Sequence, residues 1–294
     1  MPRTHERRFR VRHYECDAYD TVYYTNYLRY VQETALDASA AAGFDSAWYA
    51  ARGFVWLVRE TAIEFLSPLR YGDSFRVKTW VRNMRQALSK RAYELYLEDG
   101  GALVARAETD WAFIEAATGK PARILPEFRD AFFPDGPPPD EPRERFPQQP
   151  SAPPDAFTQR RRVEWRDIDP AQHVNNSVYL AYSEDCAVEA SSQCGWPPTR
   201  MRASGFTVAI TRCRIEYRIP ALLSDELAVA TWLSDPTAST AVRHFAIHRV
   251  GDGALLARAR ANLRCQDATA GAEMPFPEAY WRDIEGGCAQ RDLS

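Results

Sequence analysis

Two short stretches place a carboxylate a few residues before a segment with the pattern of a helix. Asp17 precedes the first such segment, Asp169 precedes the second, and His173 follows Asp169 by four positions. A carboxylate or an imidazole can act as a general base or a nucleophile. The backbone N–H groups of a helix's first turn have no partners within the helix, so they can stabilise the oxygen of a carbonyl under attack. The spacing therefore suits attack on a carbonyl that lies between the acidic side chain and the helix start.

The two stretches belong to an internal repeat. A constant offset of 152, the difference between 169 and 17, aligns the two halves without a gap from the first Asp to the last strand. Matches of Gly, Pro and Trp at one offset over so long a stretch do not arise by chance, so the sequence predicts a duplicated domain. The matched residues include Gly43 with Gly195, Gly53 with Gly205, Pro68 with Pro220, Asp73 with Asp225, Trp80 with Trp232 and Arg91 with Arg243.

Each copy has the pattern of a short strand, one long helix and a run of further strands. Apolar and small residues recur at helical spacing before Gly43, which predicts a helix from Tyr24 to Ala42 and a counterpart from Asn176 to Cys194. A strand precedes each helix, at Phe9–Tyr14 and Arg162–Trp165. A helix followed by an antiparallel meander predicts an α+β fold in which a sheet wraps around a central helix. The meander of the first copy is predicted at Val55–Leu66, Ser74–Arg82, Ser89–Leu97 and Ala102–Ile114.

Proline-rich sequence separates the copies. The segment from Phe132 to Pro154 has no hydrophobic period, which favours an extended connector. We therefore expect an N-terminal domain over residues 1–120, a connector over 121–157, a C-terminal domain over 158–268 and a tail over 269–294.

The composition argues against several classes of function. A net charge of −3 gives no electrostatic reason to expect a nucleic acid or a membrane as partner, and no apolar run is long enough to span a bilayer. The six cysteines show neither a CxxC pair nor the spacing of a zinc site, so we expect free thiols, no metal and no cofactor. No apolar segment follows the basic N-terminus, which predicts a cytoplasmic protein without a secretory signal.

Both motifs at the helix starts resemble those of hotdog-fold thioesterases. The run Cys16–Leu28 is similar to the motif of acyl-CoA thioesterases of the 4-hydroxybenzoyl-CoA thioesterase type. The run Asp167–Asn176 is similar to the helix-entry motif of acyl-ACP thioesterases, which are tandem hotdogs. The resemblance implies a tandem (double) hotdog whose copies form an internal pseudo-dimer. The sequence departs from these motifs where Tyr19 and Asp20 replace the usual glycines and where Ala171 replaces a catalytic Asn.

The resemblance also implies roles for individual residues. Asp17 is expected to be the base or nucleophile of the main site, with the N–H of Tyr24 as oxyanion donor. In the second copy Asp169 is the equivalent carboxylate and His173 is an additional base or orienting group. Because little else of the acyl-ACP constellation is present, we expect the second site to be the weaker one.

Four further polar or aromatic residues are predicted around the oxyanion or the substrate. An Asn just before or at the start of a helix is also a common N-cap, so a capping role stays open for the two Asn of the second copy. These four residues are Tyr23, Asn26, Asn175 and Asn176.

The predicted function is hydrolysis of an acyl-CoA thioester to a carboxylic acid and a free thiol. Such hydrolysis needs no strong general acid because the departing thiol is acidic, with a pKa near about 8.5 for a comparable Cys side chain. Three alternatives remain open: an acyl-ACP thioesterase, a hotdog enoyl-thioester hydratase or dehydratase, and a non-catalytic module that binds acyl thioesters. Homo-oligomerisation beyond the internal pair also remains open.

Overall fold

A computed structural model describes residues 1–139 and 144–285 of the chain. The chain divides into unit 1, Met1–Arg145, and unit 2, Phe146–Ser294. Unit 1 contains β1 (Thr4–Arg10), α1 (Tyr24–Ala41), α2 (Ser46–Arg52), β2 (Phe54–Phe65), β3 (Ser74–Arg85), β4 (Leu88–Leu97), β5 (Leu103–Glu115) and α3 (Pro126–Phe132). Unit 2 contains β6 (Phe157–Arg162), α4 (Asn176–Gln193), α5 (Pro198–Ala203), β7 (Phe206–Tyr217), β8 (Glu226–Ser234), β9 (Thr240–Arg249), β10 (Leu255–Asp267) and α6 (Glu278–Glu285).

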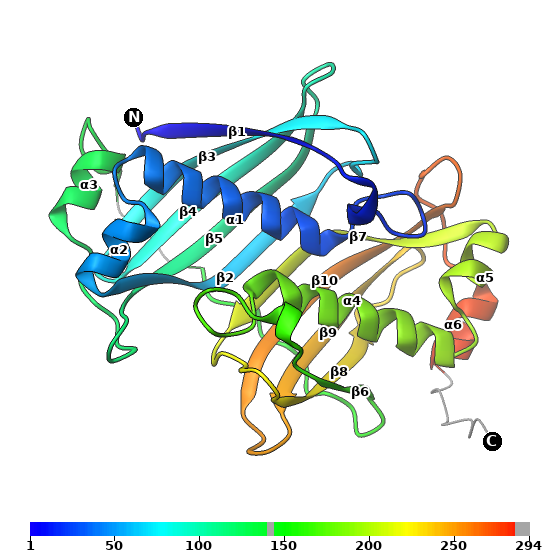
Figure 1. Cartoon of the computed structure of the whole chain (residues 1–294). Helices are drawn as coiled ribbons and strands as arrows, with labels where there is room; N and C mark the ends of the chain where they lie inside the picture. The colour runs from blue at the N-terminus through cyan, green and yellow to red at the C-terminus, as the bar shows by residue number, and fades with distance from the viewer. Residues whose placement is uncertain (140–143, 286–294) are drawn as a thin grey trace. The chain divides into compact units, whose positions relative to one another are not determined.

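In each unit one long helix lies against an antiparallel sheet (Figure 1). The strand order is β1-β3-β4-β5-β2 in unit 1 and β6-β8-β9-β10-β7 in unit 2, so strands related by the repeat take the same place. The register repeats as well, because His5 lies opposite Thr79 and Phe157 lies opposite Thr231. This architecture confirms the predicted α+β fold with tandem hotdogs. Pairing of the two copies as a pseudo-dimer stays a prediction.

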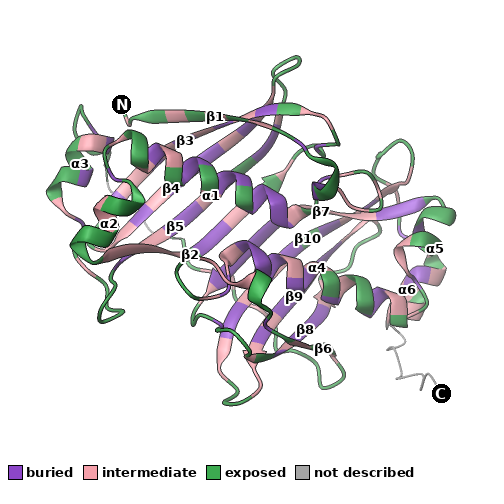
Figure 2. Ribbon diagram, in the orientation of Figure 1, coloured by how far each residue is buried: buried purple, intermediate pink, exposed green. Residues whose placement is uncertain are grey.

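The central helices form where the hydrophobic period predicted them. Helix α1 ends at Ala41 and α4 at Gln193, each one residue before the predicted end. Large side chains early in α1, such as Tyr27 and Leu28, are buried, and small residues such as Ala38 follow in its later turns (Figure 2). Small side chains let a sheet approach a helix closely.

Two tyrosines on each central helix fix the loops around its start. Tyr27 Oη accepts from the N–H of Leu69 at 2.9 Å, and its repeat partner Tyr179 accepts from the N–H of Ala221 at 2.8 Å. One turn later, Tyr30 Oη donates to a carboxylate oxygen of Glu15 at 2.8 Å. Its counterpart Tyr182 donates to Asp167 at 2.7 Å, and both acceptors lie in one-turn 3-10 helices. The duplication therefore extends to individual hydrogen bonds.

Replacing Tyr30 by Phe is expected to destabilise unit 1 by about 1.5–3 kcal/mol, the usual range for a buried hydrogen bond to a charged group. The side chain of Glu15 is only 9% exposed, so water cannot replace the lost donor. The midpoint of urea unfolding measures this change. Tyr14→Phe, at a position 74% exposed, is the control, and an equal midpoint shift in both variants would contradict the assignment.

The first strand of each copy lies earlier than predicted. β1 ends at Arg10 and β6 at Arg162, although strands were predicted to reach Tyr14 and Trp165. Arg10 lies opposite Ser74, the first residue of β3, so no partner strand remains for the residues beyond it. The chain therefore turns into the one-turn 3-10 helix at His13–Glu15.

Each repeat continues past the predicted domain boundary. Residues 121–157 were predicted to be a connector, but they contain α3, whose Phe128 is fully buried against Phe44 and Phe113. Residues 269–294 were predicted to be a tail, but they contain α6, whose Tyr280 is buried against Phe206. The offset of 152 relates α3 to α6 just as it relates α2 to α5. We therefore propose that the repeats run to about residues 133 and 285.

The cysteines differ in part from the prediction of free thiols. Cys16, Cys186, Cys213 and Cys265 are free, and burial raises the pKa of the Cys213 thiol to about 12. Cys194 is disulfide-bonded, so the prediction is wrong at that position. Cys288 lies outside the described residues. Within the described ranges, no helix is both long and apolar enough to cross a bilayer.

Candidate active site

In the first copy, the carboxylate of Asp17 is bound within its own loop. Its Oδ1 accepts from the N–H of Tyr19 at 2.8 Å and from the N–H of Thr21 at 3.0 Å, and its Oδ2 accepts from the hydroxyl of Thr21 at 3.1 Å. The N–H of Asp17 donates to the carbonyl of Thr21 at 2.8 Å, and Asp20 closes the turn at φ +62°. These contacts are those of a turn-forming Asp, and both oxygens already accept hydrogen bonds.

Two of the residues predicted around the first site have structural partners instead. The N–H of Tyr23 donates to the carbonyl of Glu15 at 3.0 Å, so it is not available to an oxyanion. Asn26 is buried, and its Nδ2 donates to the same carbonyl at 2.9 Å while its Oδ1 accepts from Arg29. Asn26 therefore fixes the 3-10 turn to α1. The half-buried Tyr24 packs its ring edge-on against Phe65 at 4.7 Å between centroids.

The second copy builds the same loop with different side chains. Asp169 Oδ1 accepts from the N–H of Ala171 at 2.9 Å, the N–H of Asp169 donates to the carbonyl of His173 at 3.0 Å, and Gln172 closes the turn at φ +63°. His173 takes the place of Thr21, which removes the hydroxyl contact to the carboxylate. Asn175 takes the place of Tyr23, and its Nδ2 donates to Asp169 Oδ2 at 3.2 Å. Three predicted site residues therefore meet in the second copy.

The imidazole of His173 lies between two acceptors. Its Nδ1 is 3.2 Å from the carbonyl oxygen of Val174 and 3.8 Å from Asp169 Oδ1. A carbonyl only accepts, so a neutral imidazole in this place has its proton on Nδ1 and its lone pair on Nε2. Among the described residues Nε2 has no hydrogen-bond partner, and the side chain is 22% exposed. His173 can therefore act as a base toward a small molecule at its Nε2 side.

Helix α4 begins beside this imidazole. Asn175 caps it, because its Oδ1 accepts from the N–H of Ser177 at 3.0 Å, and its own N–H donates to the carbonyl of Asp167 at 2.9 Å. The capping alternative is thus correct for Asn175. The next amide, that of Asn176, has no hydrogen-bond partner among the described residues. It points out of the positive end of an 18-residue helix, which suits it to bind an oxyanion.

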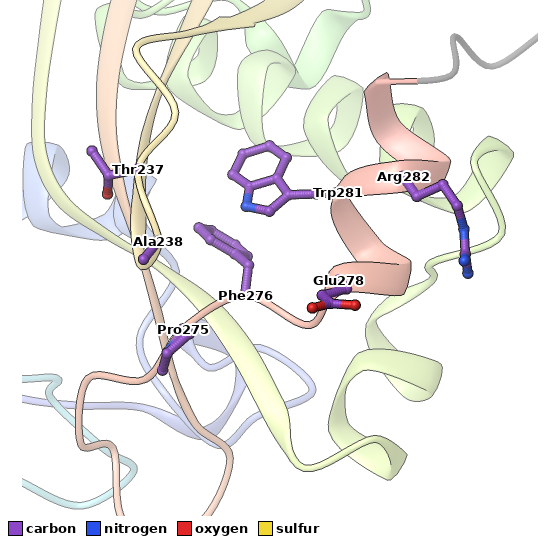
Figure 3. Close-up of a pocket in the computed structure, with 7 residues that line it drawn as sticks. All are labelled: Thr237, Ala238, Pro275, Phe276, Glu278, Trp281 and Arg282. Carbon is purple, nitrogen blue, oxygen red and sulfur yellow. The ribbon is translucent and has the colours of Figure 1, made fainter.

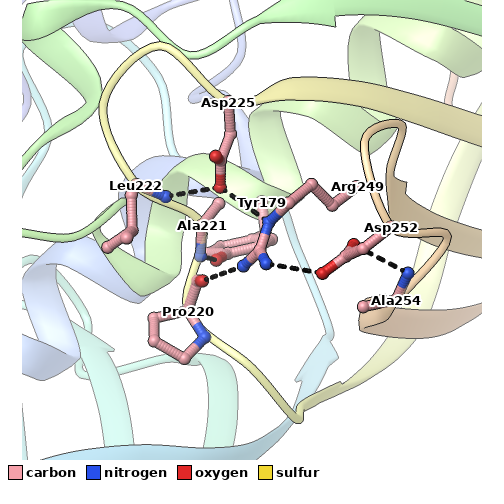
Figure 4. A network of polar contacts seen from close by, with 8 residues as sticks. All are labelled: Tyr179, Pro220, Ala221, Leu222, Asp225, Arg249, Asp252 and Ala254. Atoms are coloured by element: carbon pink, nitrogen blue, oxygen red, sulfur yellow. Dashed lines mark hydrogen bonds and ion pairs between the residues drawn. The ribbon is translucent and has the colours of Figure 1, made fainter.

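A network of charged residues fixes the loop that supports the second site (Figure 4). Asp225 accepts from Arg249 Nε at 2.9 Å, and Arg249 Nη2 donates to the carbonyl of Pro220 at 3.1 Å. The carbonyl of Ala221 in the same loop accepts from the N–H of Val174 at 2.9 Å. Val174 follows His173 directly, so the network holds the backbone on which the imidazole depends.

A hollow of about 640 Å³ lies on unit 2, apart from these residues (Figure 3). Its lining comes from the loop before β9 and from the start of α6, and includes Phe276, Glu278 and Trp281. No predicted site residue lines this hollow, so we do not assign it to the candidate active site.

Both halves match models of thioesterase families. Residues 2–132 match the acyl-ACP thioesterase N-terminal domain, and residues 163–282 match the thioesterase-like superfamily. Each model covers somewhat less than half of the chain, and the two matches do not overlap.

Individual relatives agree with these matches. The chain is 26% identical over 184 residues to a chloroplastic palmitoyl-acyl carrier protein thioesterase from Cuphea hookeriana, which covers 59% of this chain and 44% of the relative. It is 35% identical over 96 residues to a 1,4-dihydroxy-2-naphthoyl-CoA hydrolase from Thermosynechococcus vestitus, which covers 32% of this chain and 65% of that protein. The chain therefore spans about half the length of the plant relatives it matches.

A solved structure shows the same fold over nearly the whole chain. The 12:0-ACP thioesterase from Umbellularia californica superposes with a TM-score of 0.71 at 19% identity, covering 90% of this chain and 98% of that one. At this identity the comparison shows the fold alone.

Proposed function

We propose, on the premise that both halves of this chain belong to hotdog-fold thioesterases, that it hydrolyses an acyl thioester to a carboxylic acid and a free thiol. The observation that carries the proposal is the contact set of His173. Its Nδ1 faces a carbonyl and a carboxylate, which leaves the lone pair of Nε2 for a water molecule beside the start of α4.

The proposed reaction uses the residues in a fixed order. His173 Nε2 takes a proton from water as the water oxygen attacks the thioester carbonyl carbon, and Asp169 stabilises the imidazolium that forms. The Asn176 N–H and the positive end of α4 hold the oxyanion; one such donor is worth about 2.7–4 kcal/mol in the transition state. The C–S bond then breaks, and the imidazolium returns its proton to the departing thiolate.

The hydrogen bonds of the two carboxylates support ranking the second site first, the reverse of the ranking predicted from the sequence. Asp17 accepts hydrogen bonds from three donors of its own loop, so both of its carboxylate oxygens already have partners. Its loop has Thr21 where the second copy has His173, so the first copy has no imidazole at this position of the loop. We assign Asp17 a turn-forming role, with catalysis at the second site.

The relatives that match the chain suggest two carriers for the acyl group. We propose an acyl group on acyl carrier protein or on CoA, because relatives of both kinds match the chain. The cytoplasmic location expected from the sequence stays a prediction.

Replacing each of the two carboxylates in turn tests which of the two sites is the main one. Asp169→Asn is expected to lower thiol release by about a hundredfold because the imidazolium loses its counterion. Asp17→Asn is expected to lower it less than about tenfold, because an amide oxygen still accepts from the loop. Thiol release from the same acyl chain on CoA and on acyl carrier protein measures both effects and identifies the better carrier. A larger loss in Asp17→Asn would return the main site to the first copy, and chromophore loss from an enoyl thioester without thiol release would favour a lyase.

A further inference from the structure

Three hydrogen-bond donors gather inside unit 1, away from both loops described above. Arg91 and Tyr93 lie two residues apart on β4, and Trp111 lies on β5. Arg91 is opposite Thr109 and Ser89 is opposite Trp111, so alternation along the strands puts the three donors on one face of the sheet. Arg91 is 7% exposed and Tyr93 is 1% exposed. We call Arg91, Tyr93 and Trp111 the donor cluster.

None of these donors has a hydrogen-bond partner among the described residues. The hydroxyl of Tyr93 and the Nε1 of Trp111 are buried without a partner, although Trp111 and Thr109 lie beside that hydroxyl. No carboxylate of the described ranges contacts Arg91, whose Cζ lies 5.2 Å from the ring centroid of Phe132. Burial lowers the pKa of Arg91 because desolvation disfavours its charge. Buried charges and donors of this kind are costly unless something pairs with them.

The internal repeat supplies a comparison within the same molecule. The residues of unit 2 equivalent to Tyr93 and Trp111 are Phe245 and Leu263, both apolar. Only the arginine recurs, as Arg243. Its partners in unit 2 are the hydroxyl of Thr231 at 3.5 Å and the hydroxyl of Tyr280, which takes the place of Phe128. A requirement of the fold alone would apply to both units, so the extra donors of unit 1 point to a ligand.

On one side the donor cluster lies against apolar rings, of which Phe132 contacts Arg91. Phe128 and Phe132 of α3 belong to a buried hydrophobic cluster with Phe113 of β5. Convergent polar groups against an apolar wall are the usual form of a site for a mostly apolar ligand with one polar end. Because the cluster offers donors and one positive charge, the matching end is an acceptor-only anion.

We propose that unit 1 binds an acyl chain whose far end carries a carboxylate, held by Arg91, Tyr93 and Trp111. The substrate class is then the monothioester of a dicarboxylic acid. This inference rests on the proposed function only in taking the bound chain to be an acyl group that is to be hydrolysed.

Binding of two matched esters tests the inference without any turnover. Monomethyl decanedioate has a carboxylate at its far end, whereas dimethyl decanedioate has none, and isothermal titration calorimetry gives both affinities. The protein is expected to bind the monomethyl ester about ten- to a hundredfold more tightly, the value of a charge-assisted hydrogen bond. Arg91→Met is expected to lose this preference, whereas the matched variant Arg243→Met is expected to keep it. Equal binding of the two esters, or loss of the preference in both variants, would overturn the proposal.

Three further measurements keep the test decisive. Tyr93→Phe introduces the residue found at the equivalent position of unit 2, Phe245. It is expected to reduce the preference for the monomethyl ester about threefold to tenfold, at unchanged melting temperature. Thermal unfolding without ligand is expected to give Arg91→Met a melting temperature no lower than that of wild type, because an unpaired buried charge is removed. A large drop would assign Arg91 a structural role instead. Thiol release from decanedioyl-CoA and decanoyl-CoA is measured separately, so selective ester binding without thiol release would reject the hydrolase and retain the binding site.

Discussion

Replacing His173 by Ala is expected to lower the rate of thioester hydrolysis by about a hundredfold to ten-thousandfold, the usual contribution of a general base. The variant retains the cap of α4, because Asn175 still accepts from the N–H of Ser177, and it retains the carbonyl of residue 173 that closes the loop. The substrate affinity is therefore expected to change little while kcat falls. Thiol release under saturating acyl thioester measures the effect.

The internal repeat provides the control for this variant. Thr21→Ala removes the side chain at the equivalent position of the first copy, where the hydroxyl only supports Asp17, so its rate is expected to stay within about threefold of wild type. Imidazole added to the buffer is expected to restore part of the activity of His173→Ala, because a free base can enter the space that the side chain leaves. Full activity of His173→Ala, or an equal loss in Thr21→Ala, would remove His173 from the mechanism.

The sequence was sufficient to predict the architecture because its signals are periodic. The helical spacing of apolar residues before Gly43 and the constant offset between the halves predict α1, α4 and the order of the strands. The short helices α2 and α3 were missed because each has only seven residues, too few for a period to develop. For α2 a local signal was present, since Asp45 caps its start and Gly53 ends it at φ +69°.

The candidate site could be located from the sequence, but its internal ranking could not. A motif gives the order of Asp169, His173 and Asn175, whereas the direction of each side chain depends on which loop amides and carbonyls lie within hydrogen-bond reach. Asp17 and Asp169 look equivalent in the sequence, and they differ through the side chains that surround them in the loop: Thr21 contacts Asp17, whereas His173 and Asn175 lie beside Asp169. The missed residue Glu15 also had a signal, because Tyr30 and Tyr182 recur at the offset together with an acid before each loop.

The divergence of the repeats follows a physical pattern. Contacts that fix the central helix to the loop after β2 or β7 are retained in both copies, as the hydroxyls of Tyr27 and Tyr179 show. Side chains that carry chemistry or polarity differ between copies: unit 1 has Thr21 where unit 2 has His173, and unit 2 has Phe245 and Leu263 where unit 1 has Tyr93 and Trp111.

Phe128→Ala is expected to destabilise unit 1 by about 3–5 kcal/mol, the usual cost of removing a fully buried aromatic ring from a core. Phe128 is 0% exposed, and its ring centroid lies 4.3 Å from that of Phe44 and 5.3 Å from that of Trp48. Removing the ring leaves a cavity between α2, α3 and the sheet, and the rings of Phe44 and Trp48 cannot fill it. Chemical unfolding followed by tryptophan fluorescence measures the change, since Trp48 reports on this cluster.

The same variant decides where the first repeat ends. If residues 121–157 were only a connector, removing one side chain from it would change the free energy of unfolding by less than about 0.5 kcal/mol. Asp130→Ala, on the exposed face of the same helix, is the control and is expected to stay within that limit. Tyr280→Ala is the matched change in unit 2, where the ring packs against Trp196 and Phe206, and a similar loss is expected there. Destabilisation by both ring deletions, with none from Asp130→Ala, would make α3 and α6 the closing elements of the two repeats, whereas a neutral Phe128→Ala would return α3 to the connector.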